Sequence, residues 1–534
     1  MLERLSDLIL AAAARDPDAP ALRLGDRTLT YGALAAETEA LARAWMALDL
    51  RRGDRVGVYL DKSPETVVAM MAAAAAGCSF VPINPVLKAG QVEYILRHCA
   101  VRALVTSGQR LRALASSLAD CPALKLLALT GDLDGELREL APTGVELLTW
   151  EALIAAAPPS GRSGHGAIRS DVAAIFYTSG STGMPKGVVL SHDNMIAGAQ
   201  SVSYYLGNHR EDRILSVLPL SFDAGFSQLT TAFNVGAEVV LLNYLLPRDV
   251  VRACGRYEIT GLTGVPPLWA QLIELDWPEG AARSLRYFAN TGGHMPRGTL
   301  EALRRRLPQA KPYLMYGLTE AFRSTYLDPD QVDARPNSMG KAIPNVEIAV
   351  VRPDGAPCDP GEAGELVHRG PLVSLGYWND PEATAKKFRP WPIAEAGVPR
   401  PEVAVWSGDQ VRRDEEGYLY FVGRNDEMIK TSGYRVSPTE LESVIHASGQ
   451  VGEVAALGVP HPTLGQAIVV VASAPAQGKL DGEALLGVCT RELPAFMVPK
   501  RIIEQTPLPR NANGKIDRAG LAKSLEDLFK EPAG

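Results

Sequence analysis

The residue types best suited to chemistry lie together in one short loop, between two apolar runs that each predict a buried strand. The loop reads Thr178-Ser179-Gly180-Ser181-Thr182-Gly183-Met184-Pro185-Lys186-Gly187 and offers four hydroxyls, three glycines and one lysine. Glycine lets backbone N–H groups approach an anion closely, and the hydroxyls and the lysine add further donors and charge. These residues therefore predict a cradle for a triphosphate.

The loop differs from the common P-loop, in which Gly-Lys is followed directly by Ser or Thr. Here Lys186 follows Pro185 and precedes Gly187. A Ser- and Gly-rich surface turn is the alternative interpretation, because short motifs produce false matches. The complete string resembles the signature of the AMP-forming adenylating enzymes, the superfamily of acyl-CoA synthetases, amino-acid adenylation domains and luciferases.

The resemblance implies that a carboxylic acid attacks the α-phosphate of ATP and releases pyrophosphate, with ATP and Mg²⁺ as cofactors. Such chemistry depends mostly on positioning and on neutralising charge. The segment Tyr316-Gly317-Leu318-Thr319-Glu320 resembles the superfamily segment in which the aromatic ring lies near adenine, the threonine contacts phosphate and the glutamate holds Mg²⁺. Without the resemblance, the same residues would predict only a helix start capped by Thr319.

Two further segments are similar to the parts of these enzymes that bind adenosine. Gly292 and Gly293 look like the glycine turn that lines the adenine pocket. Asp409 matches the ribose ligand, since one carboxylate can accept hydrogen bonds from both vicinal hydroxyls, and Arg424 matches a second nucleotide contact. A salt-bridged hairpin is the structural alternative for Asp409 and Arg424.

The C-terminal part contains the residues that the resemblance assigns to the second half of the reaction. Asp426 matches the hinge about which the C-terminal domain turns, and Lys430, Ser432 and Gly433 match the tunnel for the acceptor thiol. Lys515 matches the catalytic lysine that bridges the carboxylate and the α-phosphate. A lysine suits this task because it is a mobile point charge.

The residues of the predicted acid pocket do not decide between the acyl-CoA synthetases and the amino-acid adenylation domains of the superfamily. Phe222 and Asp223 occupy the positions where many acyl-CoA synthetases have an aromatic residue and a histidine. The Phe-Asp pair instead resembles the same positions of amino-acid adenylation domains, in which the aspartate pairs with the substrate ammonium. Asp223 could equally be a helix cap or a partner of Arg323. The string from Tyr316 to Tyr326 looks most like acyl-CoA ligases found with bacterial exosortase systems.

These residues lead to three hypotheses. The first is an ATP-dependent acid:CoA ligase, which forms an acyl-AMP and then an acyl thioester with CoA. The second is an amino-acid adenylating enzyme that loads the phosphopantetheine thiol of a separate carrier protein. The third is a nucleotide-binding regulatory protein without catalysis, against which Lys515, Glu320 and Asp409 count.

The pattern of helices and strands predicts an α/β fold with two parts. Helix and strand patterns alternate from residue 20 onward, which indicates a large N-terminal body (residues 1–424) of mixed sheets covered by helices. After the polar joint at 423–426, a helix from 440, strands near 454–459 and 467–474 and a helix at 482–492 predict a small α+β lid (residues 425–534). The first ten residues predict an amphipathic helix.

The composition of the chain limits the classes of partner and the cellular compartment that we expect for it. The net charge of −7 argues against a nucleic-acid binder, and six cysteines without a Cys-x-x-Cys pair indicate reduced, buried thiols. The longest apolar run is too short to span a membrane, so we expect a cytoplasmic protein that acts on a small carboxylic acid. The sequence indicates neither the identity of that acid nor the oligomeric state.

Overall fold

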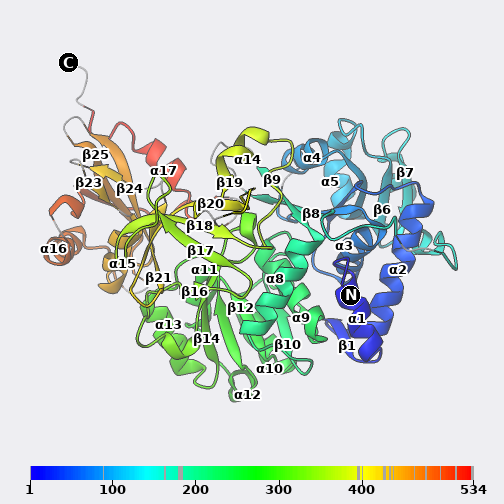
Figure 1. Cartoon of the computed structure of the whole chain (residues 1–534), viewed down its shortest axis with the longest axis horizontal. Helices are drawn as coiled ribbons and strands as arrows, with labels where there is room; N and C mark the ends of the chain where they lie inside the picture. Colours follow the sequence, from blue (N-terminus) through cyan, green and yellow to red (C-terminus); the bar gives the residue numbers. More distant parts are fainter. Residues whose placement is uncertain are drawn as a thin grey trace.

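The computed structural model describes residues 2–87, 89–161, 164–178, 185–393, 397–399, 401–424, 429–431, 434–436, 438–461, 464–475, 478–493, 495–511 and 514–530. The strands among these residues form four β-sheets. Figure 1 shows three of them in a large body and the fourth, in orange, at one end of the molecule.

The first sheet orders seven described strands as β7-β6-β5-β3-β4-β8-β9. Its neighbours run parallel except β8 and β9, which form an antiparallel hairpin. Because parallel neighbours need crossover connections, helices separate the strands in sequence. The elements are β3 (Arg55–Tyr59), α3 (Pro64–Ala76), β4 (Ser79–Pro82), α4 (Ala89–His98), β5 (Val101–Ser107), α5 (Gly108–Leu118), β6 (Leu126–Thr130), α6 (Gly135–Glu139), β7 (Glu146–Thr149), α7 (Trp150–Ala155), β8 (Val172–Thr178) and β9 (Lys186–Ser191).

The second sheet orders nine described strands as β16-β15-β14-β13-β12-β10-β11-β1-β2, so the first two strands of the chain join a sheet built mainly from residues beyond 212. Its central strands run parallel. The elements are α1 (Asp7–Arg15), β1 (Pro20–Leu24), β2 (Arg27–Thr30), α2 (Tyr31–Ala47), α8 (His192–Tyr205), β10 (Arg213–Ser216), α9 (Asp223–Val235), β11 (Glu238–Leu241), α10 (Pro247–Arg256), β12 (Gly261–Gly264), α11 (Pro266–Leu272), α12 (Glu279–Arg283), β13 (Tyr287–Asn290), α13 (Arg297–Arg306), β14 (Lys311–Tyr316), η1 (Thr319–Ala321), β15 (Thr325–Leu327), η2 (Pro329–Gln331) and β16 (Lys341–Ala342).

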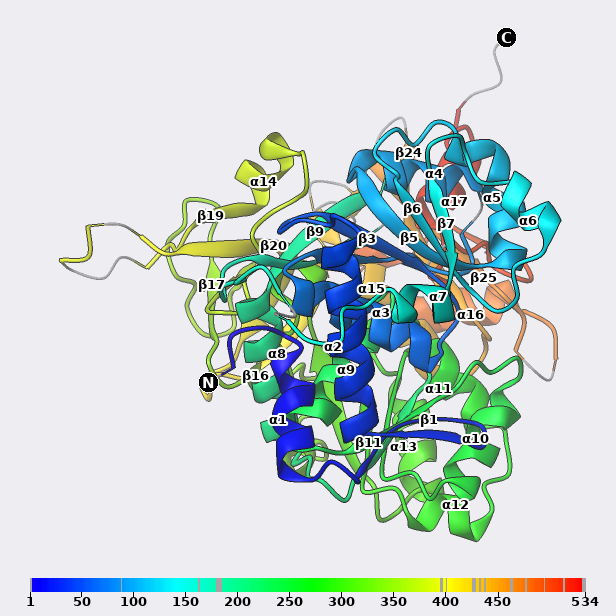
Figure 2. The same ribbon diagram turned by 90° about the vertical axis from the view of Figure 1, so that its right-hand side faces the viewer.

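One hydrophobic core joins these two sheets, and it contains buried side chains of α2, α3, α8 and α9. Figure 2 shows α2 and α8 where the two sheets meet. Helix α3 is buried along almost its whole length, and its alanines allow close packing. Its ends are well specified, since the Ser63 side chain accepts a hydrogen bond from the Thr66 N–H and Gly77 ends the helix with φ +83°.

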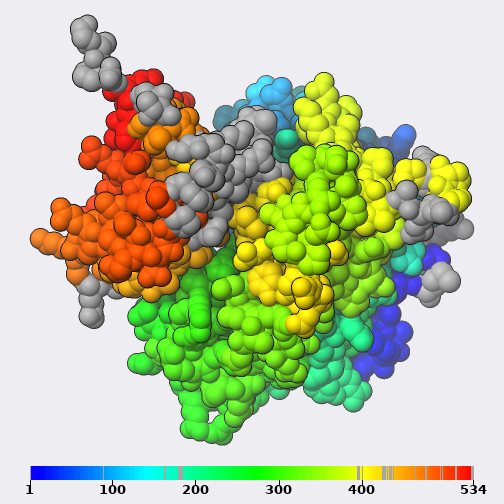
Figure 3. Space-filling view, turned by 60° about the vertical axis from the view of Figure 1, so that its left-hand side comes forward, coloured from blue at the N-terminus to red at the C-terminus, as the bar shows by residue number. Residues whose placement is uncertain are grey.

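The third and fourth sheets lie side by side in sequence but belong to different parts of the molecule. The third comprises β17 (Glu347–Val351), β18 (Ala363–Arg369), β19 (Phe388–Pro390), β20 (Val403–Arg413) and β21 (Leu419–Arg424), with α14 (Pro381–Lys387) before β19. The fourth comprises β22 (Ile429–Thr431), β23 (Tyr434–Val436), β24 (Val454–His461), β25 (Gly465–Ala472) and β26 (Arg501–Glu504), with α15 (Pro438–Ala447), α16 (Gly482–Glu492), η3 (Ala495–Met497) and α17 (Arg518–Ser524). The fourth sheet has a hydrophobic core of its own, and its domain stands out in orange and red in Figure 3.

The predicted fold class is confirmed, because a large N-terminal α/β body is followed by a smaller C-terminal α+β domain. The third sheet ends at Arg424 and the fourth begins at Ile429, so the predicted boundary at 424/425 falls between them and stays a prediction. A helix does occur near the N-terminus, but the bounds predicted for it were wrong: α1 covers Asp7–Arg15 and not the first ten residues. Tertiary contacts explain the shift, because the Leu5 N–H donates to Nδ1 of His192, 3.1 Å away.

A glycine in α8 allows the helix to pack directly on the short helical turn η1. The ring of Phe322, which is fully buried, lies against Gly198, and a Cβ at Gly198 would be 2.5 Å from Cδ1 of Phe322. Phe322 itself has φ +56°, a conformation that is unfavourable for a bulky residue. This packing therefore determines the path of the chain through η1.

We expect Gly198→Ala to lower the thermal unfolding midpoint, although alanine is the better helix former, because overpacking a core costs about 1–3 kcal/mol. Gly487→Ala in α16 is the matched control. Its added Cβ would meet only the end of the Arg491 side chain, at 3.7 Å, so its midpoint should stay level or rise. Equal midpoints for the two variants would contradict the importance of the contact with Phe322.

Candidate active site

The predicted phosphate loop connects β8 to β9, which pair as antiparallel strands. Thr178 and Lys186 are paired across the hairpin, while Ser179, Gly180, Ser181, Thr182 and Gly183 lie outside the described residues. The hydroxyl of Tyr94 donates to the carbonyl oxygen of Pro185 at 3.1 Å, which anchors one end of the loop. Gly187 is needed for close packing, since a Cβ there would lie 2.8 Å from Cγ2 of Ile175.

Glu320 and Lys186 contact the same tyrosine, which the sequence did not indicate. The hydroxyl of Tyr377 donates to Oε1 of Glu320 at 2.5 Å, and Nζ of Lys186 lies 5.3 Å from the centre of the Tyr377 ring. Burial, reinforced by the Glu320 carboxylate, raises the pKa of Tyr377. The tyrosine therefore stays a hydrogen-bond donor and brings the end of the predicted phosphate loop next to the predicted metal ligand.

Two of the residues predicted to bind adenosine also meet. The hydroxyl of Tyr316, at the end of β14, donates to Oδ2 of Asp409 on β20. Asp409 is buried and its backbone is paired with that of Arg424 on β21, so the two residues lie on neighbouring strands of one hairpin, while their predicted roles in binding stay predictions. Gly292 and Gly293 lie in an exposed turn after β13, and Gly292 has φ +74°, which favours glycine.

Asp223 already has a cationic partner in the structure. Its Oδ2 accepts a hydrogen bond from a guanidinium nitrogen of Arg323 at 2.8 Å, and its Oδ1 lies 3.3 Å from the hydroxyl oxygen of Thr319. The two side chains of the ion pair are 16% and 3% exposed. Of the three interpretations of Asp223, the geometry supports the partner of Arg323. The N-cap of α9 is Phe222, so Asp223 is not the cap, and the contact with a substrate ammonium stays a prediction. Phe222 directly precedes Asp223, which begins α9.

The C-terminal site residues are described less completely. Asp426, Ser432 and Gly433 lie outside the described residues, and Lys430 is placed only as backbone within β22. Lys515 is exposed in a turn of the C-terminal domain, where its N–H donates to Oδ1 of Asn511 at 3.1 Å. The roles predicted for these residues stay predictions.

Glu320 can bind Mg²⁺ as the single carboxylate that the protein supplies. No group of three or more histidine, cysteine or acidic side chains that could hold a metal occurs in the described part of the chain. Mg²⁺ is often bound through one or two carboxylates together with substrate phosphates and water. Since Tyr377 contacts Oε1 of Glu320, the geometry leaves Oε2 for such a role.

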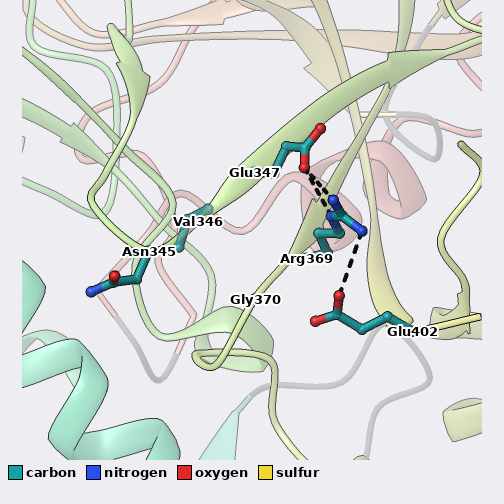
Figure 4. Close-up of a pocket in the computed structure, with 6 residues that line it drawn as sticks. All are labelled: Asn345, Val346, Glu347, Arg369, Gly370 and Glu402. Atoms are coloured by element: carbon teal, nitrogen blue, oxygen red, sulfur yellow. Dashed lines mark hydrogen bonds and ion pairs between the residues drawn. The ribbon is translucent and has the colours of Figure 1, made fainter. Parts of the chain in front are cut away.

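The hollow drawn in Figure 4 is a different site. It lies between β17 and β18, where Arg369 donates to Glu347 at 2.9 Å and lies 3.7 Å from Glu402. The six residues drawn there include none that the sequence predicted for a site. Because Arg369 is bound by carboxylates, its charge is not available to a phosphate.

Lys62 is a second residue whose role the sequence did not indicate. Its Nζ donates to three consecutive carbonyl oxygens at the end of β10, those of Ser216, Val217 and Leu218, at 3.0, 2.8 and 3.2 Å. Burial lowers the pKa of Lys62 to about 7, while Asp61 favours its charged form. The lysine thus ties the end of β3 to the segment that leads into Phe222 and Asp223. A lysine next to a buried strand end was the only signal in the sequence.

Comparisons with known proteins identify the family. A model of the AMP-binding enzyme family matches residues 9–378, and a model of the AMP-binding enzyme C-terminal domain matches residues 440–515. The chain is 32% identical to an L-proline–[L-prolyl-carrier protein] ligase of Streptomyces coelicolor over 93% of each chain. It is 31% identical to a sulfoacetate–CoA ligase of Cupriavidus necator over 98% of each chain.

Comparison of the fold with solved structures points to the same family. ATP-bound MatB from Rhodopseudomonas palustris superimposes with a TM-score of 0.83 at 25% identity, covering 98% of this chain and 100% of that one. The chain therefore belongs to the AMP-binding enzyme family and is an adenylating ligase. Among its described helices, none is long and apolar enough to cross a membrane.

We expect Lys62→Met to raise the KM for the acid about tenfold while the KM for ATP changes less than about twofold. The segment that leads into Phe222 and Asp223 would lose the lysine that holds it, and a displacement of about 1 Å in a site can cost up to about 100-fold. Pyrophosphate exchange with an acid that supports it measures both constants. Lys62→Arg should recover part of the loss, and Lys125→Met, at an exposed lysine before β6, is the control. A KM for the acid that stays at the wild-type value would contradict the positioning role.

Proposed function

We propose that the chain is an ATP-dependent acid:CoA ligase with magnesium as its cation. The observation that carries the proposal is the convergence of Lys186, Glu320 and Tyr377, with Thr319 in the same turn as Glu320 and the Tyr316–Asp409 pair beyond it. These groups provide a lysine and a carboxylate for the phosphates with their metal, and a buried carboxylate for the ribose.

In the first step a carboxylate oxygen of the acid attacks the α-phosphorus of ATP, and the bond from that phosphorus to the bridging oxygen breaks to release pyrophosphate. Mg²⁺ held by Glu320 would neutralise phosphate charge. Lys186 would bind the phosphates, and Lys515 would contact the α-phosphate and the acid. Charge neutralisation at the reacting oxygens contributes most to such catalysis.

In the second step the CoA thiolate attacks the acyl carbon, and the bond from that carbon to the AMP oxygen breaks. We propose that the C-terminal domain turns about Asp426 between the steps, which removes Lys515 and brings Lys430, Ser432 and Gly433 to the thiol. The separate hydrophobic core of the C-terminal domain supports such a motion, because a domain with its own core can move as one body.

A second candidate is an amino-acid adenylating enzyme that loads a carrier protein. The Phe222-Asp223 pair and the similarity to a prolyl-carrier protein ligase favour it. The ion pair between Asp223 and Arg323 counts against it, because that carboxylate is already neutralised. Pyrophosphate exchange across fatty, aryl, sulfonated and amino acids, repeated with CoA, distinguishes the two candidates.

We expect Lys515→Ala to reduce acyl-AMP formation by about 100-fold or more, since loss of one charge-stabilising group costs about this much. Thioester formation from chemically supplied acyl-AMP should remain within about threefold of wild type. Lys523→Ala, at an exposed lysine of α17, is the matched control. An equal loss in both steps would contradict the role in the first step alone.

Asp223→Ala tests the choice between the candidates. If Asp223 serves Arg323, its loss leaves a buried guanidinium without its carboxylate and should lower the rates with amino acids and with their des-amino analogues by a similar factor. The ratio of the two rates, measured by pyrophosphate exchange, should then change less than about twofold. A selective loss of activity with amino acids would instead favour the amino-acid adenylating enzyme.

A further inference from the structure

Residues 374–378, which we call the Tyr377 segment, connect the β8–β9 hairpin to η1 through the backbone. On the hairpin side, the Leu375 N–H donates to the carbonyl oxygen of Val189 at 2.8 Å, and the Trp378 N–H donates to that of Gly187 at 2.7 Å. On the other side, the Ser374 N–H donates to the carbonyl oxygen of Glu320 at 2.8 Å. The segment therefore joins the two elements that carry Lys186 and Glu320.

The segment is itself held in place. The Tyr377 N–H donates to the hydroxyl of Thr384 in α14 at 2.9 Å. Gly376 has φ +120°, and a Cβ there would lie 2.6 Å from Cγ2 of Thr384. The backbone around Tyr377 is thus fixed from two directions, so the position of its side chain is well defined.

The Tyr377 side chain contacts both charged groups in different ways. Its hydroxyl binds the Glu320 carboxylate, a charge-assisted bond of 2.5 Å, while the face of its ring lies 5.3 Å from the Lys186 ammonium. Packing alone does not require the hydroxyl, because phenylalanine would fill the same space. The hydroxyl therefore forms the hydrogen bond to Glu320, and the ring forms the contact with the Lys186 ammonium.

We propose that Tyr377 is a positioning residue that orients the Glu320 carboxylate toward the metal of a metal–ATP complex and holds it at a set distance from Lys186. The inference rests on the proposed roles of Glu320 and Lys186. The hydrogen bond from the Tyr377 hydroxyl to Glu320 should affect the part of nucleotide binding that depends on the metal. The contact of the Tyr377 ring with Lys186 should affect the part that does not depend on the metal.

Calorimetric titration with α,β-methylene-ATP, with Mg²⁺ and with EDTA, tests the proposal. Tyr377→Phe should weaken binding about tenfold with Mg²⁺, since hydrogen bonds to charged groups contribute this much, and less than about twofold with EDTA. Tyr377→Leu should weaken binding under both conditions, because it also removes the ring beneath Lys186.

The controls separate this inference from the proposed function. Tyr257→Phe, which removes a hydroxyl bonded to the Gly25 carbonyl far along the second sheet, should bind as wild type does. In a Glu320→Gln background, Tyr377→Phe should cause no further Mg²⁺-dependent loss. Equal losses with Mg²⁺ and with EDTA, or none, would overturn the inference. A wild-type protein that does not bind the analogue would overturn the proposed function instead.

Discussion

Two opposite charges of the candidate nucleotide site, the Lys186 ammonium and the Glu320 carboxylate, must lie near each other without neutralising each other. The ion pairs among the described residues do not join these two, and both contact Tyr377 instead. The Tyr377 segment can separate them only because its backbone is bonded to β9 on one side and to η1 on the other. The hairpin, η1 and α14 therefore all form hydrogen bonds with the Tyr377 segment.

In the predicted acid pocket, by contrast, the two opposite charges of Asp223 and Arg323 do form an ion pair. Asp223 begins α9, and Arg323 follows the strained residue Phe322, whose ring is accommodated by Gly198 of α8. The pair is nearly buried, so it is stable only if both partners are present. The hydroxyl of Thr319 lies beside the same carboxylate, which links the predicted acid pocket to the predicted phosphate contact.

Local patterns in the sequence predicted helix ends well where a capping residue, a proline or a glycine specifies the end. The helix at 482–492 was confirmed at both ends, and Ser63, Pro64 and Gly77 delimit α3 as their chemistry requires. The N-terminal helix was misplaced, because its start depends on a contact with His192 far along the chain. The assignment of strands to sheets could not be predicted from local sequence either, because β1 pairs with β11 and β8 pairs with β4, partners that are distant along the chain.

The candidate site divides in the same way. Motifs in the sequence indicated Thr319, Glu320, Tyr316 and Asp409, and the structure brings them to the β8–β9 hairpin and the β20–β21 strands, although their roles stay predictions. Tyr377 and Lys62 could not be found in this way, because each acts on a partner that is distant in sequence.

The sequence by itself determined the residue types, the succession of elements and the enzyme family, because these depend on neighbours along the chain and on short motifs. Only the tertiary structure decided which charges meet. Asp223 could pair with a substrate ammonium or with Arg323 as far as the sequence is concerned, and the folded chain places the guanidinium 2.8 Å away. A buried carboxylate takes whichever cation the packing brings to it, and packing is a property of the whole fold.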